Sequence, residues 1–463
     1  MKPALSEPIH FIGIGGAGMS GIARVMLMRG CSVTGSDAKD SSVVTALRAQ
    51  GAQINIGHSA EAVDGAGTVV VSSAIRESNP ELAAARSKGI PVIHRSEALA
   101  SLMEGYRTVA IAGTHGKTTT TSMTTVALQA CGADPSFVIG GVLTAAGTNA
   151  HSGTGDVFVA EADESDGSFL LYSPEIAVVT NVEADHLDHY GSWEKVREAF
   201  AQFAHRVEEN GGVLIACADD AGSREVADLA RSRGVSVITY GTSEDADVRI
   251  VDAHQTHQSQ SFALETADGR SGPYELSLPG LYNLRNAVAA LTIVAELGLD
   301  VDAAAEGLGR FGGTKRRFEL KGTQRGVRVF DDYAHHPTEL HNLLTAAKQV
   351  VDPERSVRVV FQPHLYSRTQ NFRREFGEAL GLADDVIVMD VYPAREDPIP
   401  GVTGAIVAAE VPLSADKVTF VPSFAEVADL VAGRCRPGDV VITAGAGDVT
   451  IVGPEILDSL RSR

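Results

Sequence analysis

A glycine-rich segment, Gly-Thr-His-Gly-Lys-Thr-Thr at residues 113–119, constrains the fold of this chain more than any other feature. It lies between an apolar run at residues 108–112, which we predict to be a buried strand, and a helix of small and apolar residues. Its Gly-Lys-Thr core resembles a Walker phosphate loop, although Ile111 stands where the usual first glycine would be. In such a loop, backbone amides surround phosphates, the lysine carries charge to them and the threonine hydroxyl can bind Mg²⁺. The segment therefore predicts an α/β domain that binds ATP.

A second glycine-rich segment, at residues 13–21, joins a predicted strand at residues 9–14 to a predicted helix. Such a turn lets a diphosphate approach the amides at a helix N-terminus, although it can also serve only close packing of helix on strand. Asp37 follows the next strand, 22 residues after Gly15, where a dinucleotide enzyme places the acid that binds a ribose. Alone, this pattern predicts an NAD-dependent dehydrogenase. Two phosphate sites in one chain instead favour activation of a substrate by ATP.

The alternation of short apolar runs with amphipathic stretches predicts three successive α/β segments with parallel sheets. We place the domains at residues 1–105, 106–314 and 315–463. A polar, strand-like alternation at residues 247–278, with a turn at Asp268-Gly269, predicts an antiparallel patch within the second domain. A length of 463 residues is compatible with two to four domains.

Charge and cysteine content exclude several classes of protein. There are 39 basic and 59 acidic residues, a net charge of −20, so the chain lacks the overall basic character of proteins that bind nucleic acid or anionic lipid. The four cysteines are far apart and form no Cys-x-x-Cys pair, which excludes a disulfide framework and a zinc ribbon and predicts a cytoplasmic location. We see no signal peptide and no run of 18 apolar residues, and therefore predict no membrane partner.

Acidic residues follow two predicted strands of the central domain. The segment Glu-Ala-Asp-Glu-Ser-Asp, at residues 161–166, offers the oxygen ligands that Mg²⁺ prefers. Because alternate strand residues face opposite ways, we expect Glu161 to bind the metal and the other acids to be solvated or to cap a helix. His186 lies in an acidic stretch after the strand at residues 176–181, so a functional role is favoured over an ordinary surface histidine.

Further polar segments follow in the last two fifths of the chain. Asn283-Leu-Arg-Asn286 opens an amphipathic helix, where an asparagine can also be a simple cap. The run at residues 315–317 is either a solvated turn or a source of a guanidinium for a transferring phosphoryl group. Asp-Asp-Tyr-Ala-His-His-Pro-Thr-Glu, at residues 331–339, joins a strand to a helix. Its histidines mark either a helix entry or a site at the carboxyl edge of a sheet, and the position after a strand favours a site.

Taken in this order, the segments resemble the muramyl (Mur) ligases of peptidoglycan synthesis, and the resemblance extends to Gly-Ala-Gly-Asp at residues 445–448. It implies an α/β protein with a Rossmann-like domain for a UDP-sugar, a central P-loop ATPase-like domain and a Rossmann-like C-terminal domain that closes over ATP. Within the family, the implied reaction joins L-alanine to the lactyl carboxylate of UDP-N-acetylmuramate through an acyl phosphate and releases ADP and phosphate. ATP and Mg²⁺ are the implied cofactors, and we expect a cytoplasmic monomer or weak homodimer.

The resemblance also assigns residues. Those implied at ATP are Gly113, Thr114, His115, Gly116, Lys117, Thr118, Thr119, Asn283, Asn286, Arg317 and Asp332. Those implied at the UDP-sugar are Gly15, Gly16, Ala17, Gly18, Asp37, Ser72 and Ala74. Those implied at the amino-acid and muramyl end are Tyr333, His335, His364 and Arg368, and those at the metals are Thr118, Glu161 and His186. The catalytic set is Lys117, His186, Arg317 and His335.

The chain departs from the family pattern at Leu365, where many relatives carry arginine. A contact to the acid is therefore either absent or supplied by Arg368 or Arg373. The alternatives within the family are a recycling ligase that adds a whole tripeptide, and a folate polyglutamate ligase. The first typically shows Gly-Ile-Cys-Gly near its start and the second lacks a glycine-rich domain in front of the ATP domain, so residues 13–18 argue against both. A regulator that cycles ATP without making a peptide bond is the alternative from another class.

Overall fold

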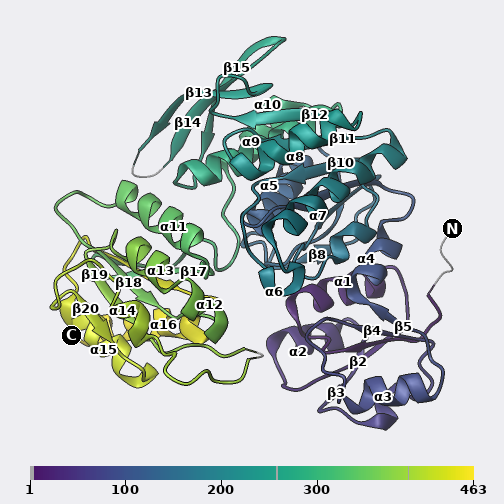
Figure 1. Cartoon of the computed structure of the whole chain (residues 1–463), viewed down its shortest axis with the longest axis horizontal. Helices are drawn as coiled ribbons and strands as arrows, with labels where there is room; N and C mark the ends of the chain where they lie inside the picture. Colours follow the sequence, from purple (N-terminus) through teal and green to yellow (C-terminus); the bar gives the residue numbers. More distant parts are fainter. Residues whose placement is uncertain (1–4, 257–258, 395) are drawn as a thin grey trace. The chain divides into compact units, whose positions relative to one another are not determined.

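The computed structural model describes residues 5–256, 259–394 and 396–463, which form two compact units (Figure 1). The first contains the described residues up to Asp252, with Phe262–Tyr274 and Arg285–Phe311. The second contains the described residues of Ala253–Ser261, with Glu275–Leu284 and Gly312–Arg463. Three sheets follow one another along the chain, in the order of the three predicted α/β segments. The boundaries at residues 105 and 315 remain a prediction.

The first sheet is parallel and has the strand order β3-β2-β1-β4-β5. Its strands are β1 (Ile9–Ile12), β2 (Val33–Asp37), β3 (Gln53–Ile56), β4 (Thr68–Val71) and β5 (Val92–His94). The connecting helices are α1 (Ala17–Met28), α2 (Ser42–Ala49), η1 (Ala60–Val63), α3 (Pro80–Ser87) and α4 (Arg95–Met103). Local sequence sets where these helices begin: the Ser41 hydroxyl caps α2, and Asn79 caps α3 ahead of Pro80.

A buried polar network links β1, β2 and α3 of this sheet. The Glu81 carboxylate lies 2.7 Å from His10 Nε2 and 2.8 Å from His58 Nδ1, and it accepts a 2.8 Å hydrogen bond from the Ser36 hydroxyl. Although burial alone raises the pKa of Glu81, the hydrogen bonds from His10, Ser36 and His58 hold it below the ordinary value. The carboxylate is therefore an ionised centre that joins three elements.

The second sheet has the order β15-β14-β13-β12-β11-β10-β6-β9-β7-β8. Its strands are β6 (Arg107–Ala112), β7 (Ser136–Val138), β8 (Ala150–His151), β9 (Val157–Glu161), β10 (Ile176–Val179), β11 (Val213–Cys217), β12 (Ser236–Gly241), β13 (Val248–Gln255), β14 (Gln260–Thr266) and β15 (Gly269–Leu276). Only two residues join β14 to β15, which fits the predicted antiparallel turn. Its helices are α5 (Lys117–Ala130), η2 (Ser168–Leu171), α6 (Leu187–Tyr190), α7 (Trp193–His205), η3 (Arg206–Asn210), α8 (Ala221–Ser232), α9 (Leu281–Glu296) and α10 (Val301–Gly309).

Helix α1 of the first sheet packs on β7 and β8, the last two strands in the order of the second sheet, within the first compact unit. A Cβ added at Gly21 would lie 2.9 Å from Val138 Cγ1 and 3.6 Å from Ala150 Cβ. Arg95, the first residue of α4, also reaches the second sheet, where its Nη2 lies 2.6 Å from Asp163 Oδ2. The two sheets therefore share packed and charged contacts.

The third sheet has the order β16-β17-β21-β18-β19-β20, and all its pairs are parallel except β16 with β17. Its strands are β16 (Glu319–Gln324), β17 (Val327–Asp332), β18 (Val357–Phe361), β19 (Asp385–Val388), β20 (Val418–Phe420) and β21 (Val440–Ala444). Its helices are α11 (Pro337–Val350), α12 (Tyr366–Asn371), α13 (Arg373–Leu380), α14 (Ala405–Ala408), α15 (Phe424–Arg434), η4 (Asp448–Ile451) and α16 (Val452–Ser462). Neighbouring residues Val359 and Val360 belong to two different apolar clusters, so β18 is covered on both faces.

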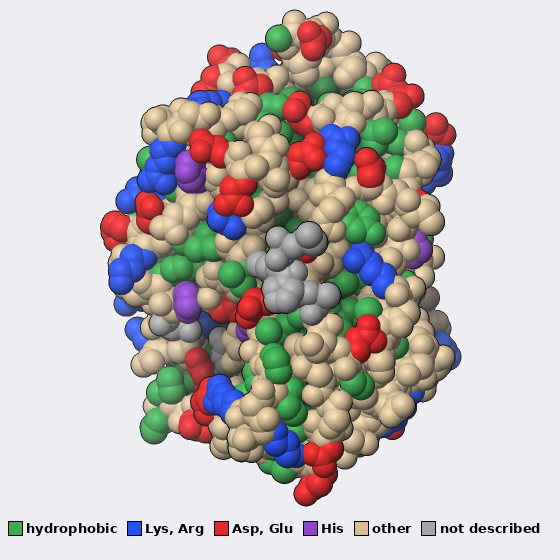
Figure 2. Space-filling view, turned by 90° about the vertical axis from the view of Figure 1, so that its right-hand side faces the viewer, with side chains coloured by type: hydrophobic (Ala, Val, Ile, Leu, Met, Phe, Trp, Pro, Cys, Tyr) green, Lys and Arg blue, Asp and Glu red, His purple; other side chains and the backbone are tan. Residues whose placement is uncertain are grey.

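On the described residues of the face in Figure 2, Lys and Arg side chains alternate with Asp and Glu, and no continuous basic area stands out. Among the residues that the structure describes, no helix has the length and apolar character needed to cross a membrane.

Candidate active site

The phosphate-loop segment joins β6 to α5 at the carboxyl edge of the second sheet. Gly113 has φ +140°, and a Cβ there would lie 2.0 Å from Thr180 Oγ1. Gly116 has φ +83° and precedes the first helical residue, Lys117. Both positions require glycine, because an L side chain would be strained and the first would also collide. The loop thus presents a helix N-terminus, which suits an anionic ligand.

Residues after β10 hold this loop in place. The Asn181 side chain accepts a 2.8 Å hydrogen bond from the His115 amide, and its Nδ2 donates to the His115 carbonyl. The Thr114 hydroxyl accepts a hydrogen bond from the Glu183 amide at 2.9 Å. Sequence reasoning did not select Asn181, although its place after a strand next to β6 was the available signal.

Lys117 points back over its own loop. Its Nζ lies 2.6 Å from the Gly113 carbonyl oxygen, 3.2 Å from that of Thr114 and 3.0 Å from Glu164 Oε1. Although burial lowers the pKa of Lys117, the carboxylates of Glu164 and Asp163 raise it above its ordinary value. The ammonium is therefore charged where phosphates are expected.

The Mg²⁺ that the resemblance implies finds suitable ligands at Thr118 and Glu161. The Thr118 hydroxyl lies 3.2 Å from Glu161 Oε2, and Glu161 Oε1 accepts a 2.6 Å hydrogen bond from the Gly140 amide. A hydroxyl and a carboxylate at the start of a phosphate-loop helix are hard oxygen donors, so these residues fit Mg²⁺.

Of the remaining acids of residues 161–166, Asp166 accepts a hydrogen bond from the Ser168 amide at the start of η2, as expected of a helix cap. For Glu164 the expectation was wrong. Glu164 is 2% exposed and pairs with Lys117. Asp163 pairs with Arg95, while Asp166 accepts a hydrogen bond from Ser73 and lies 3.5 Å from His94. Past the end of β9 the chain turns, so the alternation of a strand no longer decides where these side chains point.

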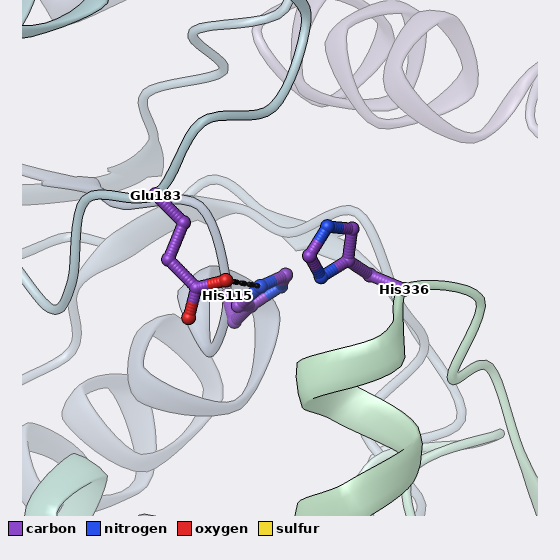
Figure 3. A group of neighbouring side chains, drawn as sticks. All are labelled: His115, Glu183 and His336. Atoms are coloured by element: carbon purple, nitrogen blue, oxygen red, sulfur yellow. Dashed lines mark ion pairs between the residues drawn. The ribbon is translucent and has the colours of Figure 1, made fainter. Parts of the chain in front are cut away.

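One histidine, His186, follows β10, and another, His115, belongs to the loop itself. His186 has φ +54°, and its Nε2 lies 3.8 Å from Glu164 Oε1 and 3.7 Å from Asp185 Oδ2. His115 Nε2 lies 3.5 Å from Glu183 Oε2, the ion pair dashed in Figure 3. His336, also drawn, precedes α11 in the second unit and takes part in a capping box with Glu339. Strands β9, β6 and β10 are neighbours in the sheet, which is why Glu161, Lys117 and His186 meet at one edge.

The start of α9 contributes one asparagine to the loop. A Cβ at Gly116 would lie 2.8 Å from Asn286 Oδ1, so this amide lies against the turn before α5. Arg285 is held by Asp219, whose carboxylate accepts its Nε at 2.7 Å. Asn283, in the second compact unit, is buried and donates to the Pro279 carbonyl at 2.7 Å. In this conformation its amide fixes the turn that leads into the helix.

The carboxyl edge of the first sheet gathers the residues expected at the UDP-sugar. The loop with Gly15, Gly16, Ala17 and Gly18 follows β1, Asp37 ends β2, and Ser72 and Ala74 follow β4. Asp37 Oδ2 accepts a 2.8 Å hydrogen bond from the Gly15 amide. The acid therefore braces the loop from its side, a contact that sequence reasoning did not foresee.

Arg316 and Arg317, in the basic run before β16, make different contacts. Arg316 Nη2 donates to the carbonyl oxygens of Gly445 and Gly447, at 2.6 and 3.1 Å, and its Nε lies 3.3 Å from Asp331. Its guanidinium thereby fixes the loop after β21. Both guanidinium groups lie over the Tyr333 ring, that of Arg316 at 4.8 Å and that of Arg317 at 5.3 Å from its centroid. Arg317 also lies 3.8 Å from Glu339.

His335 and its neighbours form an aromatic cluster in the second unit. The His335 ring meets those of Tyr333 and His364 edge to face, with centroids 5.3 and 5.7 Å apart. Its Nδ1 lies 3.0 Å from the Tyr333 carbonyl oxygen, which can only accept, so Nδ1 carries the proton. Burial, with a contribution from Arg368, lowers the pKa of His335 to about 4. The ring is therefore neutral at pH 7, and Nε2 keeps its lone pair.

Asp332 ends β17 with a fully buried carboxyl group. It accepts hydrogen bonds from the amides of Phe318, at 2.7 Å, and Ala334, at 2.8 Å. Burial nevertheless raises the pKa of Asp332 to about 6, because desolvation outweighs Arg317 and these two amides. The group joins the basic run to the segment that carries His335.

The departure at Leu365 coincides with unusual backbone geometry. Leu365 has φ +69°, its amide donates to the Tyr392 carbonyl, and its own carbonyl accepts from the Thr369 amide and hydroxyl. The His364 ring stacks on Tyr392 with centroids 5.7 Å apart. Arg368, in α12, is 9% exposed. A bulky residue with positive φ marks a strained turn, and such turns gather at functional sites.

A cavity of about 240 Å³ lies at the other end of β6, away from the phosphate loop. It is lined by residues before and at the start of β6, among them Met103 and Tyr106, and by Leu171, Tyr172 and Asn210. None of the residues expected at ATP, the metal or the UDP-sugar lines it.

Comparisons with known proteins agree along the whole chain. Three models match, described as Mur ligase family, catalytic domain, at residues 8–107, Mur ligase middle domain, at residues 111–294, and Mur ligase, glutamate ligase domain, at residues 316–447. The chain is 58% identical to a UDP-N-acetylmuramate–L-alanine ligase of Saccharopolyspora erythraea, over 98% of this chain and 93% of that protein.

Two solved structures are also similar. A UDP-N-acetylmuramate-alanine ligase from Thermotoga maritima superposes with a TM-score of 0.82 at 29% identity, covering 98% of this chain and 99% of the other. A murein peptide ligase from Psychrobacter arcticus gives a TM-score of 0.71 at 23% identity, with the same coverage, and shares the fold.

Proposed function

This chain belongs to the Mur ligase family, and from that premise we propose that it joins L-alanine to UDP-N-acetylmuramate with ATP, in peptidoglycan precursor synthesis. The observation that carries the assignment is its similarity, over nearly the full length, to proteins that bear this activity in their names. Lys117, Glu161 and His186 lie at one edge of the second sheet, which supports phosphoryl transfer at this edge. An intact set of this kind favours a ligase over a regulator that only cycles ATP.

The reaction has two steps. A lactyl carboxylate oxygen attacks the γ-phosphorus of ATP, ADP leaves, and an acyl phosphate forms. The alanine ammonium first loses one proton to solvent, and the amine lone pair then attacks the acyl carbon. The bond from this carbon to the phosphate oxygen breaks, and the new amide nitrogen loses its second proton to the leaving phosphate. Positioning of the reactants and neutralisation of the phosphate charge are the main ways in which a protein lowers such a barrier.

The first unit serves the phosphoryl step. Lys117 binds the phosphates, residues 113–119 supply amides, and Asn286 supports the turn at Gly116. Thr118 and Glu161 would hold Mg²⁺, and His186 would serve a second metal site. Bound there, Mg²⁺ would supply positive charge that offsets the charge of the transferring phosphoryl group. The edge that carries Gly15 to Gly18, Asp37, Ser72 and Ala74 receives the UDP-sugar.

The second unit carries residues for the nucleotide as well as residues for the amide-forming step. In the proposal Arg317 is assigned to the transferring phosphate, Asp332 to the nucleotide ribose and Asn283 to ATP. His364 and Arg368 are assigned to the carboxylates of muramate or alanine. His335 offers a neutral imidazole with a free Nε2 lone pair. A pKa of about 4 makes it a weak base, so its part is to accept a hydrogen bond from the amine and orient it rather than to keep the proton.

Phosphate release tests the proposed function. Purified protein is given ATP, Mg²⁺ and UDP-N-acetylmuramate with each of a panel of amino acids and with a tripeptide, and products are identified by mass. We expect release that needs both substrates and is strongest with L-alanine. Release with the tripeptide alone would reassign the chain to recycling, and ATP binding without release for any acceptor would support the regulator.

Three further expectations are part of the proposal. The domains lie at residues 1–105, 106–314 and 315–463, the protein works in the cytoplasm, and it is a monomer or weak homodimer. Sedimentation of the purified protein over a range of concentrations measures the last of these directly.

A further inference from the structure

Glu164 buries its carboxylate against the lysine of the phosphate loop. Lys117 Nζ lies 3.0 Å from Oε1 and 2.9 Å from Oε2, and the Glu164 side chain is only 3% exposed. The same Nζ contacts the carbonyl oxygens of Gly113 and Thr114. An ammonium group has three N–H donors, and three acceptors already surround this one. In this state Lys117 has no donor left for a phosphate.

Binding of a nucleotide must therefore release one of these contacts. The two carbonyl oxygens belong to the backbone of the phosphate loop itself, which is fixed by hydrogen bonds from the Thr114 amide to the Asn181 carbonyl and from the Thr180 hydroxyl to the His115 carbonyl. Glu164 comes from a different segment, the turn after β9. The exchangeable partner is consequently Glu164. A buried carboxylate that loses the ammonium paired with it is costly, so another positive charge has to take the place of Lys117.

The surroundings of Glu164 suit a divalent cation. His186 Nε2 lies 3.8 Å from Oε1, and carboxylate and imidazole groups both bind divalent metals. Among the described residues, Oε2 has no hydrogen-bond partner of good geometry in spite of its burial. The Tyr190 hydroxyl donates to the Glu164 carbonyl oxygen at 2.5 Å, which fixes the backbone of this residue.

We propose that Glu164 is a positioning residue that holds Lys117 in the nucleotide-free protein and gives it up to the phosphates when Mg²⁺ enters with the nucleotide. The proposal rests on the proposed function, since it requires a nucleotide at residues 113–119. Its measurable consequence is a coupling: Glu164 opposes nucleotide binding without Mg²⁺, and therefore increases the factor by which Mg²⁺ tightens that binding.

Calorimetric titration of the full-length protein with ADP, with Mg²⁺ and with a chelator, measures this factor without any turnover. Glu164→Gln keeps the size of the side chain and removes its charge. We expect it to bind ADP about tenfold more tightly than the unaltered protein when Mg²⁺ is absent, and the Mg²⁺ factor to fall by about the same ratio. Glu164→Asp, which holds the charge one methylene further from Nζ, should give a smaller change in the same direction.

Asp166→Asn is the matched control, because it removes a charge from the same segment while its carboxylate contacts Ser73 and His94 rather than Lys117. Its Mg²⁺ factor should stay unchanged. An equal fall in this control would mean that general charge removal, and not the ion pair, sets the factor.

Weaker ADP binding in both Glu164 variants, by the same ratio with and without Mg²⁺, would mean that Glu164 only supports the fold, and the proposal would be overturned. Failure of the unaltered protein to bind ADP under either condition would instead overturn the proposed function, and this role of Glu164 with it. Thermal unfolding of each variant shows whether it is folded before titration.

Discussion

At the scale of single residues, Asp332 and His335 carry opposite dependences on pH. Asp332 has its pKa raised from 3.8 to about 6 by burial, so its contribution to folding is present below pH 3.8 and is lost as the pH rises through 6. His335 has its pKa lowered from 6.5 to about 4 by burial, so its contribution is present above pH 6.5 and is lost as the pH falls through 4. Between pH 4 and 6 the two largely cancel.

Replacing either Asp332 or His335 should reveal the pH dependence of the group that remains. We expect Asp332→Asn to gain stability relative to the unaltered protein as the pH rises from 4 to 7, and His335→Gln to lose it. Each differential is on the order of 3 kcal/mol, from shifts of about two to two and a half pKa units. Thermal unfolding of both variants at several pH values is the measurement. Parallel curves for the two variants would contradict the opposing titrations.

The residues of the site could be predicted where a motif fixes the chemistry. They were missed where a turn of the chain redirects a side chain. Glu161 was selected because it ends a strand, and it does contact Thr118. Glu164 was set aside by the same rule, but the chain turns after β9 and brings it back to Lys117. Asp37 lies at the predicted edge, yet its contact with the Gly15 amide depends on the tight turn of the loop and not on spacing.

At the scale of elements, the Glu81 network should decide how firmly β1, β2 and α3 are joined. Glu81→Ala leaves buried His10 and Ser36 without their acceptor, and we expect a loss of about 3 kcal/mol or more in the free energy of unfolding. Glu61→Ala, an exposed glutamate in η1, is the control and should change stability by less than about 0.5 kcal/mol. Hydrogen exchange should accelerate in β1 and β2 for the first variant, and unchanged exchange there would argue against the network.

The phosphate loop depends on glycine in a way that a matched pair can test. Gly113→Ala would place a Cβ 2.0 Å from Thr180 Oγ1, so we expect ADP affinity to fall by about tenfold or more as the loop shifts. Gly132→Ala also has positive φ, at +77°, but faces open space at the end of α5, and should keep its affinity. Calorimetric titration with ADP compares Gly132→Ala, which adds only backbone strain, with Gly113→Ala, which adds strain and a collision with Thr180. Equal affinities would show that the loop tolerates the shift.

Strands buried on both faces were predictable from their apolar runs, and β1, β6 and β10 lie where the sequence indicates them. The short strands β7 and β8, of three and two residues, were not predictable in this way. Segments of that length carry no periodicity of their own, and pairing with neighbours determines their conformation.

At the scale of the molecule, the first and second sheets share one compact unit, although the sequence divides them into two segments. Gly21→Val should disturb both, because the added methyl groups meet Val138 and Ala150. We expect a loss of about 1–3 kcal/mol from overpacking. Hydrogen exchange should rise in α1 and in β7 and β8 together.

Met28→Val places the same β-branched side chain at an exposed position of the same helix, 47% accessible, and is the control. Its effect should stay near the helix-propensity cost, about 0.5 kcal/mol. Faster exchange confined to α1 in Gly21→Val would show that the sheets do not respond together. This grouping was beyond sequence reasoning, since it depends on which helix faces meet and not on the order of elements along the chain.

The saturated contacts of Lys117 also bear on the search for inhibitors. A compound screened against the nucleotide-free protein meets an ammonium already neutralised by a glutamate and two carbonyl oxygens. Acidic fragments designed as phosphate mimics will be under-represented among its hits, and neutral ones favoured. Screens for such mimics should use protein loaded with Mg²⁺, in which we expect the Lys117 ammonium to be available to bind them.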